Sequence, residues 1–247
     1  MLMLLLAAAP PAIGQTPGGR FSDNNFHSWF VYSGDHAIRG RWGVHLEGQF
    51  RRNGFAVRPQ QLLLRPAVNF QITENVAISA GYGHVSTHRY GENPVLTAFP
   101  EHRLHQQITV RHSLGTAWGM AELQHRLRME ERWIGLRTLQ PDGVPRAAGS
   151  RYQNRLRYML RVSVPVRKTR WSVVAYDELF LGLPGGQSLR TFDQNRAFGG
   201  LGYRFERQTR IEAGYLQQSL LQRSGRVLEL NHTIQVGIYT TVPFRKR

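Results

Sequence analysis

Polar and apolar side chains alternate with a period of two along most of this chain. Within residues 122–133, one parity holds Gln124, Arg126, Arg128, Glu130 and Arg132, and the other holds Leu123, Leu127, Met129 and Trp133. Successive side chains of a β-strand point to opposite faces, so this pattern predicts strands whose two faces meet different environments. Residues 152–164 alternate in the same way. The sequence therefore predicts an all-β fold.

The charges on the polar parity favour a membrane barrel over a soluble sandwich. The polar face of a sandwich meets bulk water, whereas a barrel lumen can hold a ladder of arginines and carboxylates as ion pairs. No stretch after the N-terminus approaches the roughly 20 apolar residues of a spanning helix, so a membrane protein of this sequence has to span as a closed barrel. We therefore predict a closed antiparallel transmembrane β-barrel with short periplasmic turns and longer outer loops.

Eleven segments have strand character, and residues 29–38 are the first of them. Because bacterial single-chain barrels use an even number of strands, the prediction is ten to twelve. Ten strands result if residues 29–38 lie outside the wall, and twelve if residues 20–26 add a short strand, which is the favoured alternative. The longer loops are expected at residues 53–59, 87–100, 134–150, 182–191 and 219–227.

The two ends of the chain indicate export to the bacterial outer membrane. An apolar run at residues 1–9 is followed by prolines and small residues, which predicts a signal peptide at residues 1–14. A lead-in segment is expected at residues 15–28 and the barrel at residues 29–247. The terminal aromatic Phe244 resembles the signal that the barrel-insertion machinery recognises. The expected partners are this machinery, outer-membrane lipids and lipopolysaccharide, and the barrel is expected to be a monomer.

The basic residues are unusual in kind. All but two of the 32 are arginine, 16 acidic residues are available as partners, and the net charge is +16. Arginine suits fixed, bidentate pairing with carboxylates. The chain has no cysteine, which excludes disulfides and thiolate chemistry. No basic helix supports nucleic-acid binding, and the sequence offers no set of metal ligands and no cofactor motif.

Aromatic residues cluster near the strand ends, where the interfacial girdles of a membrane barrel lie. Trp29, Trp42, Trp133, Trp171 and Tyr203 are examples.

Several separate segments resemble one known family. They are WGVHLEGQFRR at residues 42–52, QQLLLRP at 60–66, EERW at 130–133, NRLRY at 154–158, DQNR at 193–196 and GLGY at 200–203. Together they resemble the family known as domain of unknown function 2490, from about Trp29 to the C-terminus. The resemblance implies an outer-membrane barrel of unassigned activity, and it implies no catalytic residue.

The first functional hypothesis is a narrow pore that favours small anionic solutes, or a passive structural barrel if the lumen charges are all paired. The side chains expected to line the lumen are Glu47, Arg51, Arg65, Glu101, Arg103, Arg126, Arg128, Glu130, Arg132, Arg155, Arg157, Arg161, Glu178, Arg196 and Glu212.

The alternative is an outer-membrane lipid hydrolase. His84 and Ser86 lie two apart on one strand and share the apolar parity, and Glu92 follows in the next loop. A hydroxyl, an imidazole and a carboxylate could act there as nucleophile, base and orienting acid. The simpler interpretation is that His84 and Ser86 are polar rim residues at headgroup level. A third possibility is a structural or adhesion role through the loops at residues 87–100 and 134–150.

Overall fold

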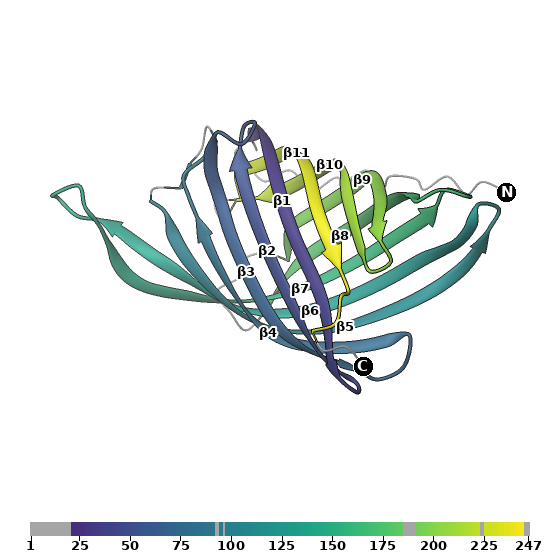
Figure 1. The fold of residues 1–247 in the computed structure, drawn as a ribbon. Helices are drawn as coiled ribbons and strands as arrows, with labels where there is room; N and C mark the ends of the chain where they lie inside the picture. The colour runs from purple at the N-terminus through teal and green to yellow at the C-terminus, as the bar shows by residue number, and fades with distance from the viewer. Residues whose placement is uncertain (1–20, 92–93, 96, 185–190, 223–224, 245–247) are drawn as a thin grey trace.

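The computed structural model describes residues 21–91, 94–95, 97–184, 191–222 and 225–244. They form one closed barrel of eleven strands (Figure 1). The strands are β1 (Phe21–Arg39), β2 (Trp42–Asn53), β3 (Arg58–Gln71), β4 (Val76–Thr87), β5 (Phe99–Thr116), β6 (Gly119–Leu139), β7 (Pro145–Pro165), β8 (Trp171–Leu183), β9 (Phe192–Glu206), β10 (Thr209–Leu221) and β11 (Val227–Thr240). The predicted signal peptide at residues 1–14 lies outside the described residues. No helix among the described residues is long and apolar enough to cross a membrane.

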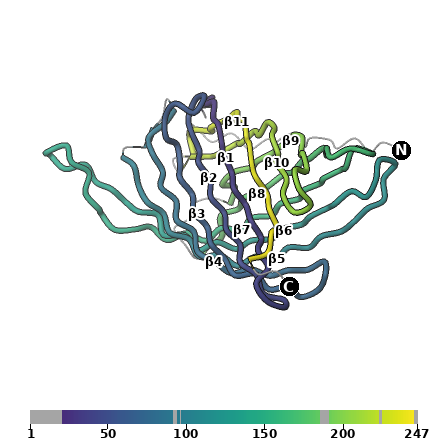
Figure 2. The backbone as a smooth tube through the Cα atoms, in the orientation of Figure 1, coloured from purple at the N-terminus to yellow at the C-terminus, as the bar shows by residue number. Residues whose placement is uncertain are grey.

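Ten neighbouring pairs of strands are antiparallel, and the barrel closes by a parallel pairing of β1 with β11. Figure 2 shows β1 between β2 and β11, and Phe21 pairs in register with Val227. An odd number of consecutively antiparallel strands leaves the first and last parallel, and a parallel ladder still satisfies their backbone groups. The count of eleven lies within the predicted range, but the even number favoured from the sequence is wrong.

Both routes to an even number fail on the same strand. Residues 29–38 belong to the wall, and residues 21–26 continue the same strand instead of adding another. The barrel wall therefore begins at Phe21, inside the segment expected to be a lead-in at residues 15–28. Asp23, Asn25 and His27 face the interior there, while polar Ser22 and Asn24 face outward. The contrast between the two faces is absent, which is why the alternation did not reveal this part of the strand.

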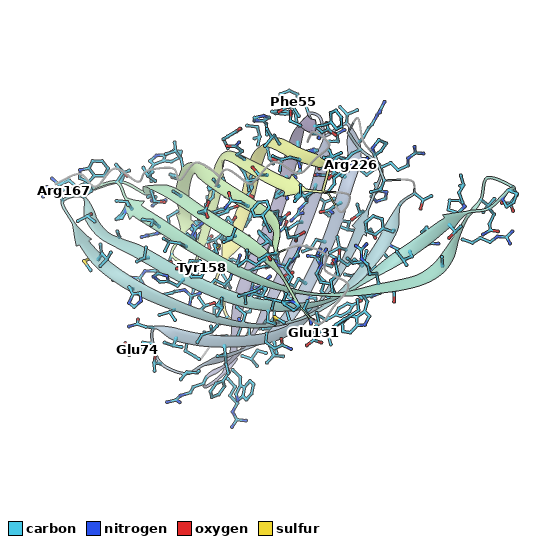
Figure 3. All side chains as sticks on the ribbon, turned by 180° about the vertical axis from the view of Figure 1, so that it is seen from behind. Phe55, Glu74, Glu131, Tyr158, Arg167 and Arg226 are labelled. Carbon is cyan, nitrogen blue, oxygen red and sulfur yellow. The ribbon has the colours of Figure 1, made fainter. Side chains whose placement is uncertain are left out.

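The connections divide between two ends of the barrel. We call the end at residues 40–41, 72–75, 117–118, 166–170 and 207–208 the turn end, and the opposite end the loop end. Figure 3 labels Glu74 and Arg167 at the turn end, and Phe55 and Arg226 at the loop end. The loop predicted at residues 134–150 is shorter than expected, because β6 and β7 pair until Leu139 meets Pro145. This hairpin extends beyond the rest of the wall (Figure 1).

The distribution of polarity is the inverse of that in a soluble protein. Large apolar side chains are exposed on the outer face, and charged side chains are buried inside. The outer apolar set includes Phe30, Leu64, Val68, Ile78, Leu104, Ile108, Leu127, Tyr158, Val173, Leu201, Ile211, Ile234 and Ile238. Hydrocarbon on the outside and water or ion pairs on the inside are the two environments of a transmembrane barrel.

Aromatic pairs flank the apolar outer face on both sides. Trp42 packs on Phe70, and Trp171 packs on Tyr203, near the turn end, with ring centroids 4.8 Å and 4.9 Å apart. Trp133 pairs with Tyr152 nearer the loop end. This arrangement is that of the interfacial girdles expected from the sequence.

His125 is a polar residue on the apolar parity of β6, and a hydrogen bond on the outer face explains its position. His125 turns outward, and its Nδ1 lies 2.7 Å from the Tyr158 hydroxyl of β7. Figure 3 shows Tyr158 on the wall. An imidazole among apolar side chains needs such a partner, because an unsatisfied polar group is costly away from water.

Candidate functional site in the barrel interior

Two cavities occupy the interior, one above the other along the barrel. The loop-end cavity has a volume of about 360 Å³ and the turn-end cavity about 410 Å³. Both are lined by Gln49, Arg65, Arg157 and Arg196, which therefore mark the level at which the cavities meet. We call these four side chains, together with the neighbouring Arg51 and the Trp29 and Phe180 rings, the waist.

Charges from three adjacent strands form the densest ion-pair network. Glu130 of β6 accepts hydrogen bonds from Arg155 Nη2 at 2.6 Å and from Arg157 Nη1 at 2.5 Å. Glu178 of β8 accepts from Arg157 Nη2 at 2.6 Å and from Arg126 Nη2 at 2.7 Å. The register places Glu130 directly opposite Arg155, so two adjacent strands with inward charges meet as partners. Arg157 thus links both carboxylates.

Smaller ion pairs lie above and below this network. At the loop-end side, Glu101 accepts from Arg103 at 2.7 Å and from Arg132 at 2.5 Å. Arg65 donates to Glu47 at 2.6 Å.

At the turn-end side, Glu212 binds Arg161 by two hydrogen bonds and Arg210 by one of 2.7 Å. Most of these carboxylates are nearly inaccessible, and Glu130 and Glu212 are 0% and 1% exposed.

The fifteen side chains singled out from the sequence all turn into the interior, on the faces described above. Glu47, Arg126 and Arg132 are partly buried and the other twelve are buried. Each of the five glutamates pairs with at least one arginine, and nine of the ten arginines, all except Arg51, pair with a described carboxylate. Their role in permeation is taken up below.

Sequence reasoning missed several interior groups. Trp29 was expected in an outer girdle, but its ring lies inside the barrel and is 2% exposed. Phe180 is fully buried inside. Asp193 accepts from Arg155 at 2.8 Å, and Asp35 lies 2.8 Å from His45 Nδ1. Parity is the signal that would have placed Trp29 and Phe180 inside. Trp29 is on the same face of its strand as Asp35, and Phe180 is on the same face as Glu178.

Of the ten arginines predicted to line the lumen, three lack a close carboxylate among the described residues. Arg51 donates to the side-chain oxygens of Gln49 and Gln61 and forms no ion pair there. Arg128 and Arg196 have a carboxylate oxygen only at 3.9 Å, from Glu130 and Glu178 respectively. A buried guanidinium without a counter-charge is unfavourable, so these three groups mark the places where the interior is in excess of positive charge.

Aromatic rings hold three arginines of the waist in place. Arg51 lies 4.0 Å, and Arg196 5.0 Å, from the centroid of the Trp29 ring. Arg196 also lies 4.7 Å from the Phe180 ring, which Arg157 approaches to 4.4 Å. Such cation–π contacts are stronger in a desolvated site than on a surface. The waist is therefore a stack of guanidinium groups on two rings.

The candidate hydrolase residues lie on the opposite, outer face of the wall. His84 Nε2 is 3.2 Å from Ser86 Oγ, and the His84 ring packs edge-on against His102. Glu92 lies outside the described residues. The part of the chain that the structure describes gives His84 no hydrogen bond to a carboxylate. Among the described residues, the imidazole and the hydroxyl thus come together without an orienting acid.

Tyr90, in the connection between β4 and β5, closes one side of the loop-end cavity. Its hydroxyl donates to Glu229 at 3.0 Å, and its ring packs edge-on against His27. Burial, together with the nearby Glu229 carboxylate, raises the pKa of the Tyr90 phenol. Tyr90 therefore stays a neutral hydrogen-bond donor. No group of three or more possible metal-ligating side chains occurs among the described residues.

The family model described as "Protein of unknown function (DUF2490)" matches residues 26–229, which include most of the barrel wall and most of the residues that line the two cavities. The chain belongs to the DUF2490 family. An uncharacterised protein of Methylorubrum extorquens is 30% identical over 185 residues, which cover 72% of each protein. Among solved structures, the NanC porin matches with a TM-score of 0.48 and 9% identity, over 87% of this chain and 98% of that one. The resemblance expected from the sequence is therefore confirmed, and the DUF2490 description assigns no activity.

Proposed function

We propose that this DUF2490 barrel is a narrow, anion-selective pore of the bacterial outer membrane. The observation that carries the proposal is the group of three interior arginines without a close carboxylate. Arg51 borders the loop-end cavity, Arg128 borders the turn-end cavity, and Arg196 borders both. Rings of arginine or lysine favour anions in a pore, because a small anion lowers its energy beside each uncompensated positive charge.

The composition of the loop-end cavity supports the same selectivity. Eight arginines are among the described residues that line it, against the carboxylates of Glu101, Asp193 and Glu229. Cations entering from this side meet a positive field, and field lines are focused where the walls have a low dielectric constant. We propose the outer membrane as the location because the apolar outer face, flanked by aromatic pairs, suits a lipid bilayer.

The partners proposed for the barrel follow from its two surfaces. Outer-membrane lipids and lipopolysaccharide would cover the apolar face, and small anionic solutes would enter the lumen. The barrel-insertion machinery would act during assembly, and the finished barrel would work as a monomer. A lumen without permeation would leave a passive structural barrel.

Single-channel conductance of the refolded chain in planar bilayers, under a salt gradient, tests the pore. The expected result is discrete openings with a reversal potential on the anion-selective side. Arg128→Ala should shift this potential toward zero, since it removes an interior positive charge. Arg167→Ala is the matched control, because Arg167 is exposed in the turn after β7. A folded barrel that conducts nothing would refute the pore.

A second candidate function is a lipid hydrolase on the outer face, and the one observation that favours it is the His84–Ser86 hydrogen bond. In such a reaction Ser86 Oγ would attack an acyl ester carbonyl while His84 takes its proton, and His84 would return that proton to the leaving alkoxide. Water would then hydrolyse the acyl-serine. Release of fatty acid from lipopolysaccharide or phospholipid vesicles, abolished by Ser86→Ala, would support it. The absence of released fatty acid with the folded wild type would exclude it.

A further inference from the structure

We infer that the waist contains an oxyanion-binding site, formed by Arg51 and Arg196 on the Trp29 ring and open to the loop-end cavity, for the phosphate or carboxylate group of a small molecule. The inference deepens the proposed function, since it names the chemical class of the bound solute. It adds a specific, saturable site to a lumen that is otherwise only positive on average.

Arg196 is the central group of this site. It is buried, and it forms no hydrogen bond to any of the residues that the structure describes. Its Nε atom is among the buried polar atoms without a partner, and its nearest carboxylate oxygen is 3.9 Å away. A guanidinium carries five N–H donors, so Arg196 has nearly all of its hydrogen-bonding capacity free. Buried donors in this condition call for an acceptor that the described residues do not supply.

Arg51 provides the second positive charge. Its Nε and Nη2 donate to Gln49, and its Nη1 donates to Gln61, so its orientation is set by neutral amides. These contacts hold the side chain but do not neutralise it. Arg51 and Arg196 both lie within 5.0 Å of the centroid of the same Trp29 ring. The two guanidinium carbons are therefore at most 9.0 Å apart, since they lie 4.0 Å and 5.0 Å from that centroid, and both side chains line the loop-end cavity. Their uncompensated charges repel each other, and an anion bound in that cavity would offset the repulsion.

The neighbouring carboxylates do not fill this role. Glu130 and Glu178 are each hydrogen-bonded by two arginines, with distances of 2.5 to 2.7 Å to the nearest nitrogens. Both oxygens of Glu130 accept from Arg155 or Arg157, and Glu178 Oε1 accepts from Arg157 and Arg126. Glu178 Oε2 lies 3.9 Å from Arg196 Nη1, which is too far for a hydrogen bond. Glu178 therefore shares one negative charge among three arginines and does not neutralise Arg196 alone.

The platform beneath the two arginines is rigid. Trp29 Nε1 donates to Gln60 at 2.9 Å, which fixes the orientation of the indole. Phe180 is 0% exposed, and its ring centroid lies 4.7 Å from the Arg196 guanidinium, which gives Arg196 a second aromatic contact. Binding to groups that are already held in place loses little side-chain entropy. The planar fork of a guanidinium matches the paired oxygens of phosphate and carboxylate, whereas chloride offers a single acceptor atom to both N–H groups.

The adjoining cavity limits the size of the molecule. Its volume of about 360 Å³ suits a small ligand. The same cavity presents the amides of Gln60, Gln61, Gln194 and Gln218, which can hydrogen-bond polar groups of the bound molecule beyond its anionic end. The site thus belongs to a small polar solute that carries at least one oxyanion.

Isothermal titration of the refolded full barrel in detergent micelles tests the site, with inorganic phosphate and acetate as separate probes. The expected result is saturable binding of at least one of the two oxyanions, with one molecule per barrel. Arg196→Gln should weaken this binding at least tenfold. Arg111→Gln is the matched control: Arg111 lines only the turn-end cavity, and its loss should change the affinity less than threefold.

Arg196→Lys provides a second variant that keeps the charge. It should also weaken binding, because an ammonium group lacks the planar fork. Circular dichroism verifies that each variant is folded. The inference is overturned if neither oxyanion saturates, if Arg196→Lys binds as tightly as the wild type, or if Arg111→Gln weakens binding as much as Arg196→Gln.

The result also separates this inference from the proposed pore. Anion-selective conductance without saturable oxyanion binding would refute the site and leave the pore. Saturable binding by a barrel that does not conduct would refute the pore and leave the site.

Discussion

Glu130→Gln removes the carboxylate that holds two interior arginines of β7. Glu130 is 0% exposed and accepts hydrogen bonds from Arg155 and Arg157 at 2.5 to 3.0 Å. The substitution keeps the size of the side chain and removes its charge. Glu131, the next residue along β6, faces outward and forms no ion pair with the described residues. Glu131→Gln is therefore a matched control on the other face of the same strand (Figure 3).

The expected loss follows from the partners that remain. Breaking a buried ion pair by removal of one partner costs about 3–5 kcal/mol, because the other charge stays buried and uncompensated. Arg155 keeps Asp193 at 2.8 Å, and Arg157 keeps Glu178 at 2.6 Å. These contacts place Glu130→Gln at the lower end, a loss of about 3 kcal/mol in the free energy of unfolding. A polar change at the control position should stay within about 0.5 kcal/mol.

Urea unfolding of the refolded barrel in lipid vesicles, followed by tryptophan fluorescence, measures both variants against the wild type. The midpoint of Glu130→Gln should fall clearly, and that of Glu131→Gln should remain close to the wild-type value or rise, since a carboxylate facing lipid is lost. Equal effects of the two variants would refute the assignment of inner and outer faces on β6. A loss below about 1 kcal/mol for Glu130→Gln would refute the argument that the buried charges of Arg155 and Arg157 need the Glu130 carboxylate.

Three further predictions concern the outer face and the waist. Leu127→Arg places a charge on the outer face midway along β6 and should cost about 2–4 kcal/mol, whereas Leu139→Arg, at the tip of the protruding hairpin, should cost close to nothing. The folded fraction in vesicles measures both variants, and equal insertion would contradict the placement of Leu127 in the bilayer and of Leu139 outside it. Tyr158→Phe deletes the hydroxyl that bonds His125 and should cost about 1–3 kcal/mol in urea unfolding; a smaller loss would mean that the imidazole finds another partner. Trp29→Ala removes the ring on which two arginines stack and should raise the single-channel conductance, and an unchanged conductance would show that the waist does not limit the flow.

Alternation predicted the wall of the barrel well where the two faces differ in polarity. On β6 and β7 it assigned Arg128, Glu130, Arg155 and Arg157 to the inside, and the structure turns all four inward. The same rule was silent over residues 21–28, where both faces carry polar side chains. It also left the protruding hairpin as a loop, because strand pairing continued there without the support of a buried face.

The aromatic rings of the waist illustrate a second limit. Trp29 is of a residue type that is common in interfacial girdles, and only its parity relative to Asp35 distinguishes an inner from an outer position. Propensity and position near a strand end pointed to the membrane interface. The structure instead places the ring in contact with Arg51 and Arg196, from β2 and β9, and neither partner is near it in the sequence.

The period of two and the polarity of each face are local properties of the strands, so the order of residues is enough to predict a transmembrane barrel with charged residues inside. The closed wall as a whole sets the number of strands, the parallel closure of β1 with β11 and the pairing of each charge. Arg161 meets Glu212 across 51 positions of sequence, and such contacts depend on the register and tilt of every strand between them. The uncompensated arginines of the waist are a consequence of that same closure, since a charge is paired or unpaired only once the wall has brought all the others into place.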